Sequence, residues 1–250
     1  MPDTATELDL AREALYRFLA AALRDPRSDG AAPVRDPESR RLARAAADRL
    51  RGEEPAGGGR RGFGELPPEL LTVDPFAAAA GESHAELCAE YDRVFGLLGA
   101  GDCPPHETEF QPNQEPFFRS QQMADVAGFY RAFGLGSPER PDSLPLELEF
   151  MAFLLTKERL AATAGEAAVC AEAGRDFFRD HLAWWAPSFA TGLRRKAGGG
   201  PYAALAQALA AFLPAERRRF GIDTPSLPVR PVPAGRAEEG EGCAACPASV

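Results

Sequence analysis

Several features that mark other protein classes are missing from this 250-residue chain. It has no uninterrupted run of about 18 apolar residues, the length that a membrane-spanning helix requires. Valine and isoleucine are scarce while alanine is abundant, a bias that favours helices over strands. The N-terminal residues are acidic and lack the basic-then-apolar pattern of an export signal. These absences predict a helical protein of the cytoplasm without stable membrane insertion.

Positive charge is also in deficit. The 28 lysines and arginines face 37 acidic residues, which gives a net charge of −9. Nucleic-acid binding needs clustered basic side chains, so a nucleic-acid partner is not expected. An acidic surface steers a basic partner toward the protein, although acidity alone also serves solubility. The five cysteines are odd in number and mostly isolated, which is typical of reduced thiols rather than a disulfide framework.

Apolar side chains recur at three- and four-residue steps through most of the chain, and we find no alternating strand pattern. The predicted helices cover residues 7–24, 37–51, 83–98, 119–133, the stretch after Asp142, 167–185 and 202–213. The fold class is therefore all-α: a single-domain helical bundle over residues 1–221. A flexible glycine-rich loop is predicted at about residues 52–66. A proline- and glycine-rich tail at residues 222–250 is predicted to be disordered.

The helix after Asp142 is apolar on two faces, which is typical of the buried centre of a bundle. A polar loop bracketed by prolines leads straight into it. Asp142 or Ser143 can cap its first turn. Alternatively, Asp142 is free to meet a partner, because a carboxylate binds an incoming guanidinium strongly. Glu147 and Glu149 lie near the positive end of the helix dipole, which accounts for both of them.

Chemical machinery is hard to find in this sequence. It contains no Gly-x-Ser-x-Gly elbow, and the three glycines at residues 57–59 are not a phosphate-binding loop. The histidines at 84, 106 and 181 are far apart and form no helical ligand pair. The tail ends in Cys243-Ala-Ala-Cys246, which supplies two of the four ligands of a structural metal site. A metal- or iron–sulfur-handling protein is therefore the alternative function. Otherwise we expect neither an enzyme nor a bound cofactor.

Four motifs follow one another in the middle of the chain. They are Tyr-Asp-Arg-Val-Phe-Gly at residues 91–96, Cys-Pro-Pro-His-Glu-Thr-Glu at 103–109, the stretch 123–135 and the stretch 139–151. Together they resemble the TorD/DmsD/NarJ family of redox-enzyme maturation chaperones, in particular the branch that serves exported molybdenum enzymes of the dimethyl sulfoxide reductase type. The resemblance is strong over residues 83–160, fair over residues 181–189 and weak elsewhere.

The resemblance implies an all-helical cytoplasmic chaperone, monomeric or homodimeric, without catalytic chemistry. Its partners are the apo form of a molybdoenzyme catalytic subunit and the twin-arginine signal peptide of that subunit. The chaperone assists insertion of the molybdenum cofactor and delays export until the enzyme is mature. The implied peptide-binding residues are Tyr91, Phe95, Gly96, Pro105, Glu107, Thr108, Tyr130, Pro141, Asp142, Ser143 and Glu147. Within this set, Asp142 is expected to bind an arginine of the signal.

Two residues depart from the pattern of the family. Ser143 stands where the family usually has a histidine after the aspartate, and His106 stands where an aromatic residue, usually tyrosine, is expected. Loss of the histidine removes a hydrogen-bonding partner. Asp142 is then expected to provide more of the anchoring, or the peptide is bound more weakly.

Overall fold

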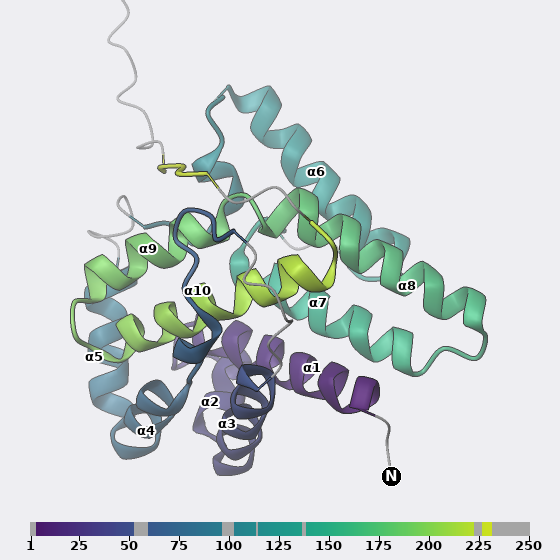
Figure 1. Ribbon diagram of the computed structural model, residues 1–250. Coiled ribbons are helices and arrows are strands. Elements are labelled where there is room, and N and C mark those ends of the chain that lie inside the picture. Colours follow the sequence, from purple (N-terminus) through teal and green to yellow (C-terminus); the bar gives the residue numbers. More distant parts are fainter. Residues whose placement is uncertain are drawn as a thin grey trace, which may run out of the picture.

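The computed structural model describes residues 4–52, 60–96, 103–113, 115–136, 139–222 and 227–231, and these residues form an all-helical fold (Figure 1). This confirms the predicted fold class. The helices are α1 (Thr4–Ala22), α2 (Ala32–Arg35), α3 (Pro37–Arg51), α4 (Asp74–Glu82), α5 (His84–Phe95), α6 (Pro116–Ala132), α7 (Leu144–Arg159), α8 (Ala164–Phe177), α9 (Ala186–Ala197) and α10 (Pro201–Arg219). None of the described helices is both long and apolar enough to cross a membrane.

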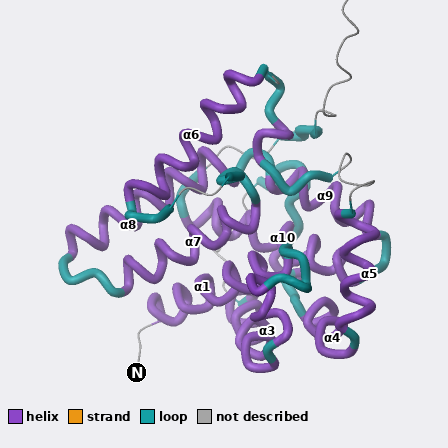
Figure 2. Tube along the Cα trace, turned by 180° about the vertical axis from the view of Figure 1, so that it is seen from behind, coloured by secondary structure: helices purple, strands orange, loops and turns teal. Residues whose placement is uncertain are grey.

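Two packed layers share one continuous apolar core. Helix α1 lies against α3 and α7, α7 also packs on α8, and α10 runs along α9. Helices α5 and α8 lie at opposite ends of the molecule in both views (Figures 1 and 2). Most apolar side chains of α7 are buried, as predicted for the central helix of the bundle.

Two helices begin at residues whose side chains cap the first turn. Helix α3 has the predicted bounds, and Asp36 caps it by accepting from the backbone N–H of Ser39. Helix α5 begins where the Ser83 side chain accepts from the N–H of Glu86. Helix α10 continues past Pro214 to Arg219, whereas the sequence predicted an end at residue 213. That prediction was wrong because the following turn is held by buried ion pairs.

One of these ion pairs joins α10 to α1. The buried carboxylate of Glu216 accepts from Arg12 Nε at 2.9 Å and from the Tyr16 hydroxyl at 3.0 Å. The two partners come from the other end of the chain, so no local pattern predicts their effect on the helix.

The single long helix predicted over residues 167–185 is divided in the structure. Helix α8 ends at Phe177, a π-helical turn follows at Phe178–Leu182, and α9 begins at Ala186. Pro187 therefore starts a new helix rather than kinking an old one, because a proline in the first turn has no N–H to lose. Helices α4 and α9 were not predicted.

The second half of the loop predicted to be flexible is fixed. Residues 53–59 lie outside the described part, but Arg217 donates to both oxygens of buried Glu65, at 2.7 and 2.9 Å. The Leu66 N–H donates to the Ala210 carbonyl at 2.9 Å. Gly64 has φ +77°, and a Cβ there would overlap the Pro187 carbonyl oxygen. Contacts with α9 and α10, rather than local apolar content, order this segment.

The predicted tail contributes one described segment, residues 227–231, which lies against α9. Cys243 and Cys246 lie outside the described residues. The domain limit at residue 221 stays a prediction.

Candidate functional site

Two of the sequence motifs meet in space. The loop that starts at Cys103 and the junction before α7 are joined by an isolated antiparallel bridge between His106 and Ser143. The Glu107 N–H donates to the Asp142 carbonyl, and the Leu144 N–H donates to the Pro105 carbonyl, both at 2.9 Å. The structure thereby brings together a group of the predicted site residues: Pro105, Glu107, Thr108, Tyr130, Pro141, Asp142, Ser143 and Glu147.

This pairing replaces the side-chain cap that the sequence predicted. Ser143 is the N-cap residue of α7, but its side chain makes no cap hydrogen bond. The Asp142 carboxylate is directed to Thr108 and Arg140 instead. The predicted cap was therefore wrong. The first N–H of α7, that of Leu144, donates to the Pro105 carbonyl of the opposing loop instead. The first N–H groups of every helix need such a partner from outside the helix.

Asp142 is not free to meet a partner, and that expectation is corrected. Its side chain is 0% exposed and accepts four hydrogen bonds. Two come from the Arg140 guanidinium at 2.9 and 3.1 Å, and two come from the hydroxyl and the N–H of Thr108 at 2.6 and 3.2 Å. Burial acts to raise the pKa of Asp142, but the bonds from Arg140 and Thr108 outweigh it and the pKa is lowered. The guanidinium of Arg140 therefore occupies the position next to Asp142 that the sequence analysis assigned to an arginine of the signal peptide.

The two departures from the family pattern lie opposite one another. Ser143 replaces the usual histidine, and its bridge partner is His106. The His106 Nδ1 lies 4.0 Å from Asp142 Oδ1, so an imidazole still approaches the aspartate, from the other loop. Burial and the positive charge of Arg140 lower the pKa of His106, which favours the neutral ring.

Glu107 is buried beside a histidine. Its carboxylate lies 3.1 Å from His181 Nδ1 and accepts from the Trp184 indole N–H at 3.0 Å. His181 belongs to the π-helical turn after α8, and its ring packs against Phe129 and Phe177. Burial raises the pKa of Glu107, and the hydrogen bond from His181 offsets only part of that effect. Glu107 therefore binds the Cys103 loop to the π-helical turn after α8.

Glu147 is fully buried on the first turn of α7. Neither carboxyl oxygen has a hydrogen-bond partner among the described residues, and the nearby Trp185 indole donates to the His181 carbonyl at 2.5 Å. Burial, followed by the charges of Glu107 and Asp142, raises the pKa of Glu147 well above its ordinary value. Burial therefore disfavours the charged carboxylate on which the predicted complementarity with the helix dipole depends.

An open cavity of about 250 Å³ lies next to this cluster, between the end of α6 and the first half of α7. Its lining is aromatic and aliphatic with one carboxylate: Tyr130, Leu135, Gly136, Leu146, Glu149, Phe150 and Phe153. The Tyr130 hydroxyl donates to the Pro141 carbonyl at 2.9 Å, which fixes one wall of the cavity to the junction. Phe150 packs edge-on against Tyr130 with ring centroids 4.9 Å apart.

Glu149 supplies the only charge among the residues that line this cavity. Its side chain is 44% exposed and pairs with Arg24 at 2.6 Å. Arg24 follows α1 and its side chain is 27% exposed. An ion pair this open to solvent contributes little to stability, so Glu149 can change partners at little cost.

The first motif lies elsewhere. Tyr91 and Phe95 of α5 pack on the ring of Tyr202 from α10, with centroid distances of 6.0 and 5.5 Å. Gly96 ends α5, where a Cβ would overlap the Asp92 carbonyl oxygen. The structure thus divides the predicted site residues into two separate groups, and only the group around Asp142 adjoins the α6–α7 cavity.

Comparison with known proteins identifies relatives of this chain. The chain matches the model of the nitrate reductase delta subunit family over residues 62–191. It is 35% identical over 150 residues to the selenate reductase assembly chaperone protein of Thauera selenatis, covering 58% of this chain and 76% of that one. It is 34% identical over 154 residues to the chlorate reductase assembly chaperone protein of Ideonella dechloratans, covering 60% and 75%.

This chain belongs to the nitrate reductase delta subunit family. The family is one of redox-enzyme maturation chaperones, as the four motifs indicated. The matched span runs from the fixed part of the loop before α4 into α9, so it includes both paired loops and the α6–α7 cavity.

A metal centre is not evident in the described part of this chaperone. There, no group of three histidine, cysteine, aspartate or glutamate side chains is placed to hold an ion. The His181 ring lies between two carboxylates. Its Nδ1 is 3.1 Å from Glu107, and its Nε2 is 3.6 Å from exposed Asp125. The alternative function, which rests on Cys243 and Cys246, is not tested by the described residues.

Sequence reasoning did not include four residues of this candidate site: Arg140, His181, Trp184 and Glu149. Arg140 stands two residues before Asp142, so an internal ion pair was a possible reading of the motif. His181 and Trp184 occur in the His-Leu-Ala-Trp-Trp stretch, where the resemblance was already noted. Glu149 carries no local signal, because its significance comes from the cavity that the fold builds around it.

Proposed function

We propose that this chain is a cytoplasmic chaperone that binds the twin-arginine signal peptide and the apo form of a molybdoenzyme catalytic subunit. It holds the enzyme open for insertion of the molybdenum cofactor and delays export until the enzyme is mature. Membership of the family supports the chaperone role, and the names of two relatives refer to assembly of a selenate and a chlorate reductase.

The α6–α7 cavity is the observation that carries the proposal. A twin-arginine signal joins basic residues to an apolar stretch, and the cavity offers aromatic walls with one carboxylate at the rim. Apolar side chains of the peptide would enter against Phe150 and Phe153. Glu149, half-exposed, would accept one of the arginines through charge-assisted hydrogen bonds. The net charge of −9 would steer the basic peptide toward the protein.

Arg24 holds the position of the peptide arginine in this proposal. Its guanidinium already pairs with Glu149, which indicates that a guanidinium is well accommodated there. When the peptide binds, Arg24 swings into solvent and a peptide arginine replaces it. The exchange leaves Glu149 paired both before and after the peptide binds.

Asp142 contributes indirectly. With its carboxylate buried against Arg140 and Thr108, it holds the two loops in register and so positions Pro141 and Tyr130 at the cavity. Pro105, Glu107, Thr108, Ser143 and Glu147 act in the same way, and the α5 motif supports the bundle through Tyr202. The direct peptide contacts are assigned to the cavity residues.

Isothermal titration with a synthetic twin-arginine peptide tests the proposal. The wild type is expected to bind it, and Glu149→Gln is expected to weaken binding about tenfold through loss of one charge-assisted interaction. Phe153→Ala removes one of the aromatic rings that line the cavity and is expected to weaken binding to a similar extent.

Exposed Glu82 at the end of α4 offers a matched control. Glu82→Gln makes the same change in charge away from the cavity and is expected to leave the affinity unchanged. Equal weakening by both glutamine variants would reduce the role of Glu149 to a nonspecific effect of charge. Binding to no twin-arginine peptide at all would contradict the proposed function.

A further inference from the structure

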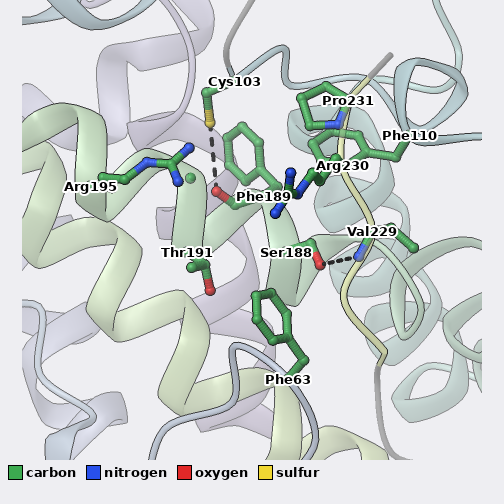
Figure 3. A pocket seen from close by; sticks show the side chains of 11 residues that line it. Phe63, Cys103, Phe110, Ser188, Phe189, Thr191, Arg195, Val229, Arg230 and Pro231 are labelled. Carbon is green, nitrogen blue, oxygen red and sulfur yellow. Dashed lines mark hydrogen bonds between the residues drawn. The ribbon is translucent and has the colours of Figure 1, made fainter.

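A second cavity, of about 370 Å³, lies on α9 at the other side of the Cys103 loop. Its walls include the rings of Phe63, Phe110 and Phe189, together with the buried thiol of Cys103 (Figure 3). This volume is in the range of small ligand pockets, which start at about 300 Å³. Nothing in the proposed function uses this cavity.

The chain itself forms one side of the cavity. Residues 227–231, Leu-Pro-Val-Arg-Pro, cross α9 as a strap without helical turns (Figure 3). The Val229 N–H donates to the Ser188 hydroxyl at 3.1 Å, and the Val229 side chain packs, half-buried, on the apolar core. Leu227 is 68% exposed, so the strap rests mainly on Val229.

The strap has the properties of a bound peptide rather than of a folded element. Pro228 and Pro231 fix their φ angles and lack an N–H, which pre-forms an extended chain and lowers the entropy lost on docking. Within the described residues 227–231, the Val229 N–H donates to α9 and the small branched side chain of Val229 packs on the core. A larger apolar side chain than valine fits beside it, because the cavity remains open next to the strap.

The described charged residues at this cavity are both basic. Arg195 of α9 and Arg230 of the strap line it, and none of the described lining residues is acidic (Figure 3). An acidic side chain in the place of Arg230 would pair with Arg195 instead. The opening therefore matches an extended segment in which an apolar residue precedes an acidic one.

We infer that this groove on α9 is a second binding surface, for an extended proline-flanked segment of a partner protein with an apolar residue followed by an acidic one. In the absence of that partner, the strap at residues 227–231 covers one side of the groove. Binding exchanges Val229 for the apolar residue of the partner, while its acidic residue meets Arg195. The surface is distinct from the α6–α7 cavity, and its test uses no signal peptide.

Alkylation of Cys103 in the full-length protein reports whether the strap opens. Cys103 is 2% exposed and lines the cavity. Val229→Gly removes the docking side chain and is expected to speed labelling of Cys103 by iodoacetamide at least fivefold, measured by peptide mass spectrometry. Leu227→Gly makes the same backbone change at an exposed position and is expected to stay within twofold of the wild type. Buried Cys88 of α5 is the internal reference for global loosening.

Two synthetic peptides then test the chemistry of the groove. Leu-Pro-Val-Glu-Pro-Val-Pro is expected to restore protection of Cys103 in Val229→Gly at a several-fold lower concentration than Leu-Pro-Val-Arg-Pro-Val-Pro. Arg195→Gln in the same background is expected to remove that difference. If Val229→Gly also exposes Cys88, Ser188→Ala opens the strap more gently and replaces it.

Three results would overturn the inference. Labelling of Cys103 at the wild-type rate in Val229→Gly would mean that the strap is not a cover. Failure of both peptides to restore protection would mean that the groove binds no such segment. Equal protection by the two peptides with Arg195 intact would remove the acidic preference. None of these outcomes depends on whether a twin-arginine peptide binds elsewhere.

Discussion

The α6–α7 cavity and the α9 cavity differ in the charge of their lining residues and in what covers their openings. Among its described lining residues, the α6–α7 cavity has one carboxylate, Glu149, which pairs with Arg24. The described lining of the α9 cavity has two guanidinium groups, Arg195 and Arg230, and includes a strap of the same chain. Under the two proposals, one protein with a net charge of −9 offers an acidic site to a basic peptide and a basic site to an acidic one.

The paired loops connect these two regions. Cys103 and Phe110, at the ends of one loop, line the α9 cavity. Between them, the loop bonds to the junction before α7, and Pro141 of that junction accepts from Tyr130 in the α6–α7 cavity. The comparison teaches that the buried ionic cluster joins the walls of the two cavities.

Asp142→Ala breaks that joint and is expected to have the largest effect. It removes four hydrogen bonds to a buried carboxylate and leaves the Arg140 guanidinium without its main partner. We expect a loss of about 3 kcal/mol in the free energy of unfolding, measured by urea denaturation. A loss below about 1 kcal/mol would mean that the loops are held by other contacts, since that is the worth of one ordinary hydrogen bond.

Gly64→Ala disturbs only the α9 side. Gly64 has φ +77°, and a Cβ there would overlap the Pro187 carbonyl, so alanine forces the loop away from α9. We expect a loss of about 2 kcal/mol in the free energy of unfolding. Labelling of Cys103 should accelerate while the affinity for a signal peptide stays unchanged. Equal damage to both functions would contradict the separation of the two cavities.

Glu147→Gln tests the protonation of the joint. Because the pKa of Glu147 is raised in the folded state, the folded chain keeps this proton while the unfolded chain loses it as the pH rises above about 4.3. The free energy of unfolding of the wild type should therefore fall as the pH rises through the raised pKa.

Glutamine at this position does not titrate, so the variant should gain stability relative to the wild type between pH 5 and 8. The expected gain exceeds about 1 kcal/mol, the scale of a buried unsatisfied polar group. Half-exposed Glu149, two residues along the same helix, provides the matched control, since Glu149→Gln should show no such gain. Parallel pH profiles for wild type and Glu147→Gln would show that Glu147 is ionised in the folded protein.

Arg24→Gln is expected to have the smallest effect on stability, within about 0.5 kcal/mol, because the pair with Glu149 is open to solvent. It removes the internal competitor for Glu149, so peptide affinity should stay the same or rise slightly. A clear loss of affinity would indicate that Arg24 contacts the peptide itself.

Local sequence patterns correctly predicted those helices whose bounds and buried faces depend on neighbouring residues. The sequence pattern was sufficient for the bounds of α3, and the apolar faces of the stretch after Asp142 correctly predicted the buried α7. The motifs also contained the residues that the structure brings together at the junction, although not the bonds between them. An aspartate beside a proline looks available in sequence, whereas the fold buries it against Arg140 and Thr108.

Long-range partners explain the rest. The Glu65–Arg217 pair fixes a loop that composition alone predicted to be flexible, and Glu216 holds α10 beyond Pro214. His106 stands opposite Ser143 only because two loops pair across a bridge. Glu149 is unremarkable in sequence and acquires its candidate role from the cavity around it. No window of neighbouring residues contains this information.

A double-mutant cycle between Glu149 and the peptide arginines tests the central claim most directly. Affinities are measured by titration for wild type and Glu149→Gln, each with the twin-arginine peptide and with versions in which either arginine is glutamine. The account predicts a coupling energy of at least about 1 kcal/mol between Glu149 and one of the two arginines. Additive effects for both arginines, with no coupling to Glu149, would contradict it.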